Sequence, residues 1–148
     1  MRVYLMVRPR LLKDFPEQAR RAEALGYDGI TMLELTVPPT LSATASSINT
    51  SRIDLLTGIF VAFPRSPMAT AYDAWAIQSL SNGRFQLGLG AQTKSHLTRR
   101  WSVNLVPPVP RMREYVEALR AIWDCWQNGS RLAYEGDHYN FSLMIPYY

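Results

Sequence analysis

The stretch Ser79–Gly90, with the sequence SLSNGRFQLGLG, decides the fold of this chain. A helix that packs Trp75 and Leu80 is predicted to end at Asn82-Gly83, because glycine tolerates the left-handed conformation that closes a helix. The apolar run Phe85–Leu89 follows at once and is bounded by glycine on both sides. Such a run is typical of a parallel strand that is covered on both faces.

The far end of this strand is a candidate binding site. Gly88 and Gly90 leave the backbone without side chains, so that a flat or phosphorylated ligand could approach it closely. Polar residues follow directly: Gln92, Thr93, Lys94 and His96. An alternating strand–helix fold presents its ligand site just past the strand ends, where these residues are expected.

Composition limits the class of protein. The chain has 148 residues, of which 47% are hydrophobic, and its formal net charge is +4. It is therefore expected to bury one ordinary core and not to be disordered. No basic run exceeds the pair Arg99-Arg100, and no basic stretch is interleaved with aromatic residues, which argues against nucleic-acid binding.

The N-terminus and the single cysteine give no sign of export or metal binding. Cys125 has no partner, so neither a disulfide framework nor a CxxC metal or redox motif is present, and it is expected to be a packing residue. The apolar run Val3–Val7 is too short for a signal segment or a membrane span. We therefore expect a cytoplasmic protein with no resident metal and no membrane partner.

Strands and helices alternate along the chain. Helical spacing of apolar residues predicts a first helix that begins after Asp14, a plausible N-cap, and stops at Gly26. A bulge or a close backbone approach is expected at Gly58, because this glycine lies inside a strand. The predicted strands are 3–7, 30–33, 53–61 and 85–89, and the predicted helices are 13–25, 40–49, 68–80 and 111–127. This alternation predicts an α/β fold whose parallel strands are joined by right-handed crossovers.

Two architectures fit this alternation, a doubly wound open sheet and a (β/α)₈ barrel. A dinucleotide-binding sheet carries glycines in its first strand–helix turn, but here that turn is Arg8–Leu12 and contains none. The pair Gly88 and Gly90 does not replace it, because the next helix is predicted to start about twenty residues later. A full barrel needs about 250 residues. The prediction is therefore the N-terminal half of a (β/α)₈ TIM barrel, with four parallel strands alternating with helices.

Several stretches together resemble the luciferase-like monooxygenase superfamily, and the resemblance covers the whole chain. The stretches that carry it are Ala22–Gly29 followed by Glu34, then Thr50–Ile59, then Leu80–Gly90. Further stretches are most similar to actinobacterial oxidoreductases that use the deazaflavin coenzyme F-420: Phe63–Pro67, Gln92–His96, Arg111–Tyr115 and Trp123–Gln127. The resemblance implies a barrel domain over residues 1–148, with 129–148 as the start of an insertion before a fifth strand.

The resemblance also implies a deazaflavin ring across the carboxyl ends of the strands, with hydride transfer at its C5 atom. We expect Gly58 and Ile59 to form a bulged backbone under the ring. Gln92 and Thr93 are expected to bind ring or ribityl oxygens near Gly90, and Arg65 or Lys94 to meet anionic groups. His96 is a candidate proton donor, or else a surface residue. Glu34 is a candidate catalytic carboxylate, or else pairs with an arginine on a neighbouring loop.

Three functions stay open at this point. The first is an F-420-dependent oxidoreductase acting on a small organic substrate, and the second is an FMN-dependent monooxygenase of the same superfamily. The third is a truncated, non-catalytic half-barrel that only binds or associates. Four strand–helix units expose two strand edges, so we expect a homo-oligomer or a second chain that completes the barrel.

Overall fold

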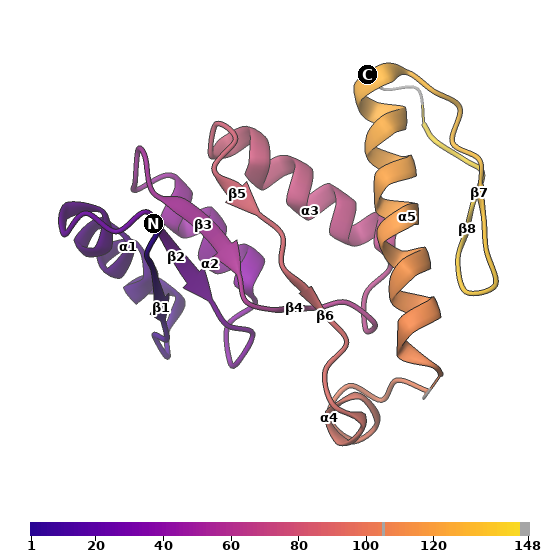
Figure 1. Cartoon of the computed structure of the whole chain (residues 1–148), viewed down its shortest axis with the longest axis horizontal. Helices are drawn as coiled ribbons and strands as arrows, with labels where there is room; N and C mark the ends of the chain where they lie inside the picture. Colours follow the sequence, from indigo (N-terminus) through magenta and orange to yellow (C-terminus); the bar gives the residue numbers. More distant parts are fainter. Residues whose placement is uncertain (105, 146–148) are drawn as a thin grey trace. The chain divides into compact units, whose positions relative to one another are not determined.

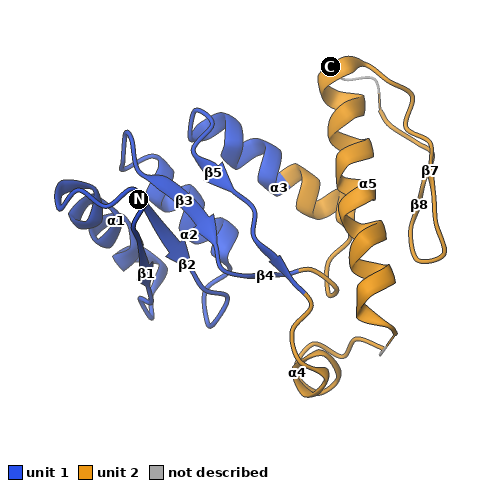
Figure 2. Cartoon of the chain, viewed as in Figure 1, with its two compact units in different colours: residues 1–61, 73–90 blue, residues 62–72, 91–148 orange. Residues whose placement is uncertain are grey.

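The computed structural model describes residues 1–104 and 106–145 and divides into two compact units (Figures 1 and 2). Unit 1 comprises residues 1–61 and 73–90, and unit 2 comprises residues 62–72 and 91–148. The helix α3, Pro67–Leu80, contributes its first six residues to unit 2 and the rest to unit 1.

Unit 1 is built on a parallel sheet. Its strands are β1 (Tyr4–Val7), β2 (Gly29–Met32), β3 (Asp54–Thr57) and β5 (Phe85–Gln86), in that spatial order. A second parallel ladder pairs β4 (Phe60–Val61) with β6 (Leu89–Gly90). The four predicted parallel strands are thus confirmed, but the third and the fourth are each interrupted once. Gly58, where a bulge or a close backbone approach was expected, falls between β3 and β4.

Helices cover one face of this sheet. They are a short 3₁₀ turn, η1 (Leu12–Asp14), then α1 (Phe15–Ala24) and α2 (Pro39–Ser47), with α2 against β3 and α1. The strand residues directed to this face are buried and form the core of unit 1: Val7, Ile30, Met32, Leu55, Thr57 and Phe85. The alternation of side chains along the strands therefore produces a single apolar layer.

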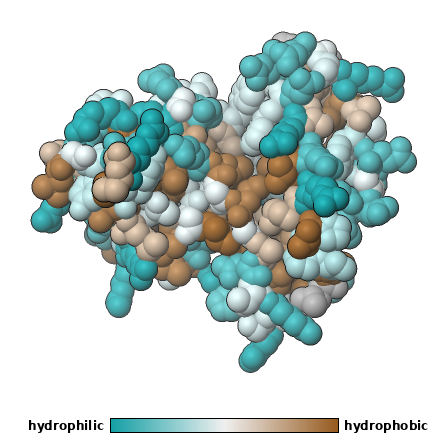
Figure 3. Space-filling model, viewed as in Figure 1, coloured by the Kyte–Doolittle hydropathy of each residue, from teal (hydrophilic) through white to brown (hydrophobic). Residues whose placement is uncertain are grey.

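The other face of the sheet is open. Met6 is 49% exposed there, Thr31 and Leu56 are half-buried, and Gln86 is exposed. In the space-filling view, brown residues reach the surface over the strands of unit 1 (Figure 3). Register pairs these residues across the strands, Met6 with Thr31 and Leu56 with Gln86, so they form one row on one face.

A single carboxylate links several strands on this open face. The Tyr4 hydroxyl donates to Asp54 Oδ2 at 2.8 Å, and the Gln86 amide donates to the same oxygen at 3.2 Å. Arg2 also meets this oxygen, at 3.2 Å. The Tyr4 ring crosses over Gly29 on the intervening strand, where a Cβ atom would lie 2.1 Å from the ring. A residue without a side chain is therefore required at position 29, so that the Tyr4 side chain can extend from β1 over β2 to Asp54 on β3.

The observed helix ends agree in part with those predicted from the sequence. Gly26 has φ +85° and ends the first helix as predicted, and Asn82 and Gly83 both have positive φ at the end of α3. The Asp14 side chain makes no capping hydrogen bond, although it precedes α1. The expected packing of α3 was wrong for Trp75 and Leu80, which are 41% and 45% exposed; Ala74 and Ile77 are buried instead.

Unit 2 contains two helices and a hairpin besides the start of α3. The helix α4 (Lys94–Arg99) begins four residues after Gly90, so the prediction that the next helix starts about twenty residues later was wrong. The long helix α5 (Pro108–Asn128) was predicted as 111–127, and Gly129 ends it with φ +70°. The strands β7 (Tyr134–Glu135) and β8 (Asn140–Phe141) form an antiparallel hairpin within 129–148; residues 146–148 lie outside the described residues.

The apolar stripe of α5 is buried unevenly. Tyr115, Ala118, Leu119 and Ile122 are buried, whereas Trp123 and Trp126 are half-buried. The Trp126 ring contacts Tyr72 at a centroid distance of 4.9 Å, and the Trp123 indole donates to the Ala71 carbonyl at 3.3 Å. Both tryptophans thus pack against the start of α3. Within the described residues, no helix has the length and apolar character that a membrane crossing requires.

Glu23, near the end of α1, binds the backbone of the segment that leads into β3. Its carboxylate accepts the backbone N–H groups of Ser51, Arg52 and Ile53 at 2.7 to 3.3 Å. Burial raises the pKa of Glu23, but the three backbone hydrogen bonds and the Arg52 charge outweigh it, so that the pKa is lowered on balance. The ionised form is therefore the one that stabilises the fold.

We predict that Glu23→Ala lowers the free energy of unfolding by about 2 kcal/mol at pH 7, because three backbone donors lose a charged acceptor. Because the pKa of Glu23 is lowered in the folded protein, its contribution to stability is fully present above the ordinary carboxyl pKa of 4.5. This contribution is lost as the pH falls through the folded-state pKa. Urea midpoints at pH 7 and pH 3 test this, and the gap between wild type and variant must narrow at pH 3. Glu17→Ala is the control, because Glu17 makes an exposed ion pair with Arg20, which contributes little to stability.

Candidate functional site

The carboxyl ends of the strands in unit 1 bring together four of the predicted site residues. Glu34 lies two residues after β2, Gly58 and Ile59 lie between β3 and β4, and Gly90 ends β6. The Gly58–Ile59 peptide bond is cis. Gly58, Ile59 and Gly90 are half-buried, so this backbone is within reach of a ligand at the strand ends.

Neighbouring atoms occupy the space that the glycines leave. A Cβ atom on Gly58 would lie 2.2 Å from Thr31 Cγ2, and one on Gly90 would lie 2.1 Å from Ile59 Cδ1. A Cβ atom on Gly88 would lie 2.1 Å from the Thr57 carbonyl oxygen. Gly88 and Gly90 therefore have packing roles within the sheet, in addition to any role in admitting a ligand.

Glu34 is directed to the backbone of the third strand. It is 7% exposed, and its Oε2 accepts the Val61 N–H at 2.6 Å. Val61 in turn pairs with Gly90 in the ladder between β4 and β6. The structure thus joins Glu34, β4 and Gly90 in one hydrogen-bonded arrangement.

The other five predicted site residues lie in unit 2. Gln92 is half-buried and has φ +67°, and Thr93 is the N-cap residue of α4 although its side chain makes no capping bond. Thr93 Oγ1 instead lies 3.3 Å from Ser95 Oγ. Lys94 and His96 are exposed in the first turn of α4. The Arg65 guanidinium stacks over the Trp101 ring at 5.3 Å.

Unit 2 also contains an arginine and aromatic cluster that the sequence did not indicate. Arg111 lies over Phe63 at 4.5 Å from the ring centroid and donates from Nε to the Tyr139 hydroxyl at 3.0 Å. The buried Tyr115 hydroxyl is hydrogen-bonded to Thr70. Burial raises the pKa of Tyr115 to about 12, although the bond to Thr70 opposes that rise. Tyr115 is therefore a neutral, structural phenol at physiological pH.

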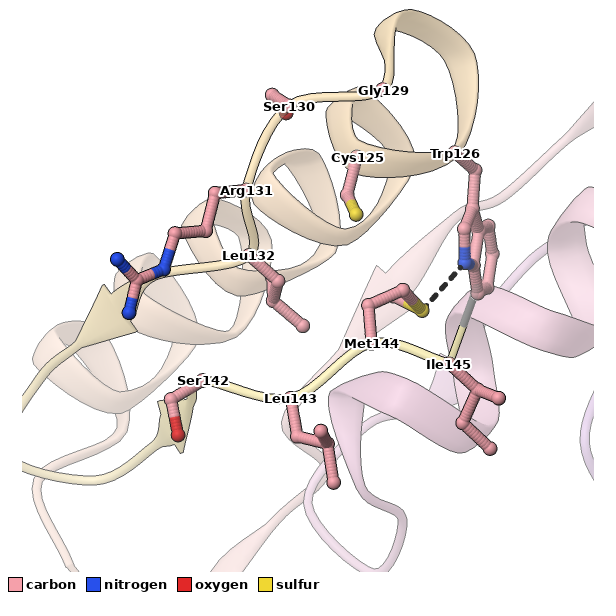
Figure 4. Close-up of a pocket in the computed structure, with 10 residues that line it drawn as sticks. All are labelled: Cys125, Trp126, Gly129, Ser130, Arg131, Leu132, Ser142, Leu143, Met144 and Ile145. Atoms are coloured by element: carbon pink, nitrogen blue, oxygen red, sulfur yellow. Dashed lines mark hydrogen bonds between the residues drawn. The ribbon is translucent and has the colours of Figure 1, made fainter. Parts of the chain in front are cut away.

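A cavity of about 490 Å³ lies near the C-terminal end of α5 (Figure 4). Its lining residues are Cys125, Trp126, Gly129, Ser130, Arg131, Leu132, Ser142, Leu143, Met144 and Ile145. The Trp126 indole donates to Met144 Sδ at 3.0 Å across it. None of the predicted site residues lines this cavity. Among residues 1–104 and 106–145, no group of three or more His, Cys, Asp and Glu side chains is placed to hold a metal ion.

The sequence profile of the luciferase-like monooxygenase family matches residues 3–146, which is nearly the whole chain. The chain belongs to this family. An uncharacterised protein of Mycobacterium tuberculosis is 41% identical over 138 residues, which are 93% of this chain and 41% of that relative. The chain therefore spans less than half the length of the curated relatives that it matches at this level.

Solved structures of flavin and deazaflavin enzymes share the fold. The FMN complex of the 3,6-diketocamphane monooxygenase component of Pseudomonas putida superposes with a TM-score of 0.82 at 15% identity, covering 98% of this chain and 45% of that one. The coenzyme F-420-dependent tetrahydromethanopterin reductase of Methanopyrus kandleri gives 0.77 at 18% identity, covering 95% and 44%. The fold is thus that of about half of a luciferase-like (β/α)₈ barrel.

We predict that Gly88→Ala destabilises unit 1 far more than Gly90→Ala. The new Cβ at position 88 meets a backbone carbonyl, which cannot move without breaking the sheet, whereas at position 90 it meets side-chain atoms of Ile59 alone, the nearest being the terminal Cδ1. We expect a loss of about 3 kcal/mol for Gly88→Ala and about 1 kcal/mol for Gly90→Ala. Urea unfolding of the two variants measures both values. Equal losses would contradict this account of the two glycines.

Proposed function

We propose that this chain forms the cofactor-binding part of an oxidoreductase that transfers a hydride between coenzyme F-420 and a small organic substrate. The observation that carries the proposal is the family match over residues 3–146, with Gly58, Ile59 and Gly90 at the carboxyl ends of the strands. Barrel enzymes bind their ligands at this end of the sheet. In such enzymes the loops largely determine which substrate binds, and the cofactor carries out the chemistry.

The residues present fit such a cofactor by the chemistry of their donors. A flavin or deazaflavin offers ring carbonyls, ribityl hydroxyls and an anionic phosphate. The Gln92 amide and the Thr93 hydroxyl are suited to the first two groups, and the cations Lys94 and Arg65 are suited to the phosphate. When bound, the deazaflavin supplies the hydride acceptor or donor. His96 would hold or release a proton at the edge of that site.

FMN is the alternative cofactor, and with it the reaction would be a monooxygenation. The P. putida enzyme is solved with FMN, and the M. kandleri enzyme depends on coenzyme F-420. We favour F-420 because the stretches Phe63–Pro67 and Gln92–His96 resemble the F-420-dependent oxidoreductases. Both cofactors offer the same carbonyls and phosphate to the residues named above.

We propose that a second chain or a second copy completes the barrel. The supporting observations are the open face of the sheet, including Met6 and Gln86, and the positions of β1 and β5 at the two ends of the strand order. Unpaired edges favour pairing with further strands. The alternative is a half-barrel that associates without catalysing a reaction.

Titration of the purified chain with coenzyme F-420 and, separately, with FMN tests both proposals. Absorbance and fluorescence report binding, and light scattering reports mass. We expect micromolar binding of the deazaflavin by an oligomer, and about tenfold weaker binding in Gln92→Ala and Lys94→Ala, because each removes a donor to the cofactor.

Controls for these variants lie on the exposed side of α5. Gln127→Ala and Arg120→Ala remove an amide and a cation of similar kind and are expected to leave the affinity unchanged. Tighter binding of FMN than of F-420 would favour the monooxygenase alternative. Absence of binding of either cofactor at every oligomeric state would reject an enzymatic role for this chain and favour the associating half-barrel.

A further inference from the structure

The backbone ladder between the third and fourth strands is interrupted, and one side chain bridges the gap. The β3–β5 pairing ends at Leu56 and Gln86, and the β4–β6 pairing resumes at Phe60 and Leu89. Between these points Thr57 Oγ1 accepts the Gly88 N–H at 2.8 Å and donates to the Gly88 carbonyl at 2.9 Å. Thr57 is 2% exposed, so water does not replace these bonds.

A second side chain supplies an acceptor on the other side of the third strand. The pairing of β2 with β3 ends at Met32 and Thr57, after which the Gly58 N–H donates to the Met32 carbonyl at 2.8 Å. Successive N–H groups of β4 then point to opposite sides, as in any strand. The Phe60 N–H reaches the Gly88 carbonyl at 2.7 Å, and the Val61 N–H reaches Glu34 Oε2 at 2.6 Å.

These two side chains hold the backbone on which the candidate cofactor contacts lie. Gly58 and Ile59 are enclosed between Thr57 and β4, and Gly90 is paired with Val61. A carboxyl oxygen can accept a backbone N–H in place of the carbonyl of a neighbouring strand. Binding geometry tolerates displacements of only about 0.5 Å, so the support of this backbone matters for the ligand.

We propose that Thr57 and Glu34 are positioning residues, which fix residues 58–61 and 88–90 by replacing the missing backbone ladder. This assigns Glu34 a role through the Val61 backbone at Oε2, in addition to the two alternatives that the sequence left open, a catalytic carboxylate or an arginine partner. The consequence for the ligand rests on the proposed function. The anchoring itself does not, and the two are tested separately.

Amide hydrogen exchange of the full chain tests the anchoring by Thr57. Thr57→Val keeps the shape and removes the hydroxyl, whereas Thr57→Ser keeps the hydroxyl. We expect the Gly88 amide to exchange about tenfold faster in Thr57→Val and at the wild-type rate in Thr57→Ser. The Leu55 amide, which donates to the Arg84 carbonyl, is the internal reference and must not change.

The same measurement applies to Glu34. Glu34→Ala is expected to accelerate exchange at Val61 about tenfold, while Glu34→Gln, which keeps an acceptor oxygen, retains most of the protection. The Leu55 amide, which donates to the Arg84 carbonyl outside the anchored segments, again serves as the reference. The proposal would be overturned if the Gly88 amide exchanged at the same rate in Thr57→Val and Thr57→Ser, or the Val61 amide at the same rate in Glu34→Ala and Glu34→Gln. A uniform rise in amide exchange rates across the whole sheet would also overturn it.

Cofactor affinity separates a positioning role from a merely structural one. Whichever of F-420 or FMN binds the wild-type chain is expected to bind Thr57→Val about tenfold more weakly and Thr57→Ser normally. Thr44→Val is the matched control, because Thr44 makes a comparable hydroxyl bond to a backbone carbonyl within α2. The urea midpoints of both variants are measured as well, so that any loss of affinity can be compared with the loss of stability.

The hydrogen-exchange experiment and the cofactor-affinity experiment have distinguishable outcomes. Weakened binding in Thr57→Val and in Thr44→Val alike would overturn the positioning role, because the loss would follow general stability. If the wild-type chain binds neither cofactor, the proposed function fails, and the exchange rates at Gly88 and Val61 alone decide whether the two residues anchor the strands.

Discussion

Every buried backbone N–H needs an acceptor, and this constraint governs the strand ends of unit 1. The parallel ladder meets it as far as Thr57 and Gln86, where the third and fourth strands both leave regular pairing. Beyond that point Thr57 and Glu34 supply the bonds that a continuous ladder would have supplied. These buried side chains hold the irregular backbone at Gly58 and Gly88, together with the backbone bonds from Gly58 to Met32 and from Phe60 to Gly88.

Local sequence patterns predicted most of the fold correctly. Periodic apolar residues located the four helices α1, α2, α3 and α5. The position of Gly58 inside an apolar run predicted an irregularity in the third strand, but not that the strand is interrupted there. The helix α4 was missed, because Lys94–Arg99 is short, is preceded by polar residues and buries only Leu97. The exposure of Trp75 and Leu80 was also missed, because helical spacing alone does not say which face of α3 meets the sheet.

The candidate site was predicted as a set of positions but not as a set of contacts. Strand ends can be counted along the sequence, so Glu34, Gly58 and Gly90 were placed at one end of the sheet. The bonds that join them connect residues about thirty apart, such as Thr57 with Gly88 and Glu34 with Val61. No pattern in a single sequence shows which buried hydroxyl or carboxylate will find a distant backbone group.

The link from Tyr4 to Asp54 has a consequence for how a barrel can form. It joins the first strand to the third above Gly29, and Gln86 extends it to the fourth strand through the same carboxylate oxygen. Contacts that draw non-adjacent strands together on one face bend a sheet toward that face. The link therefore favours curvature of the sheet toward this face, which is the kind of bending that barrel closure requires.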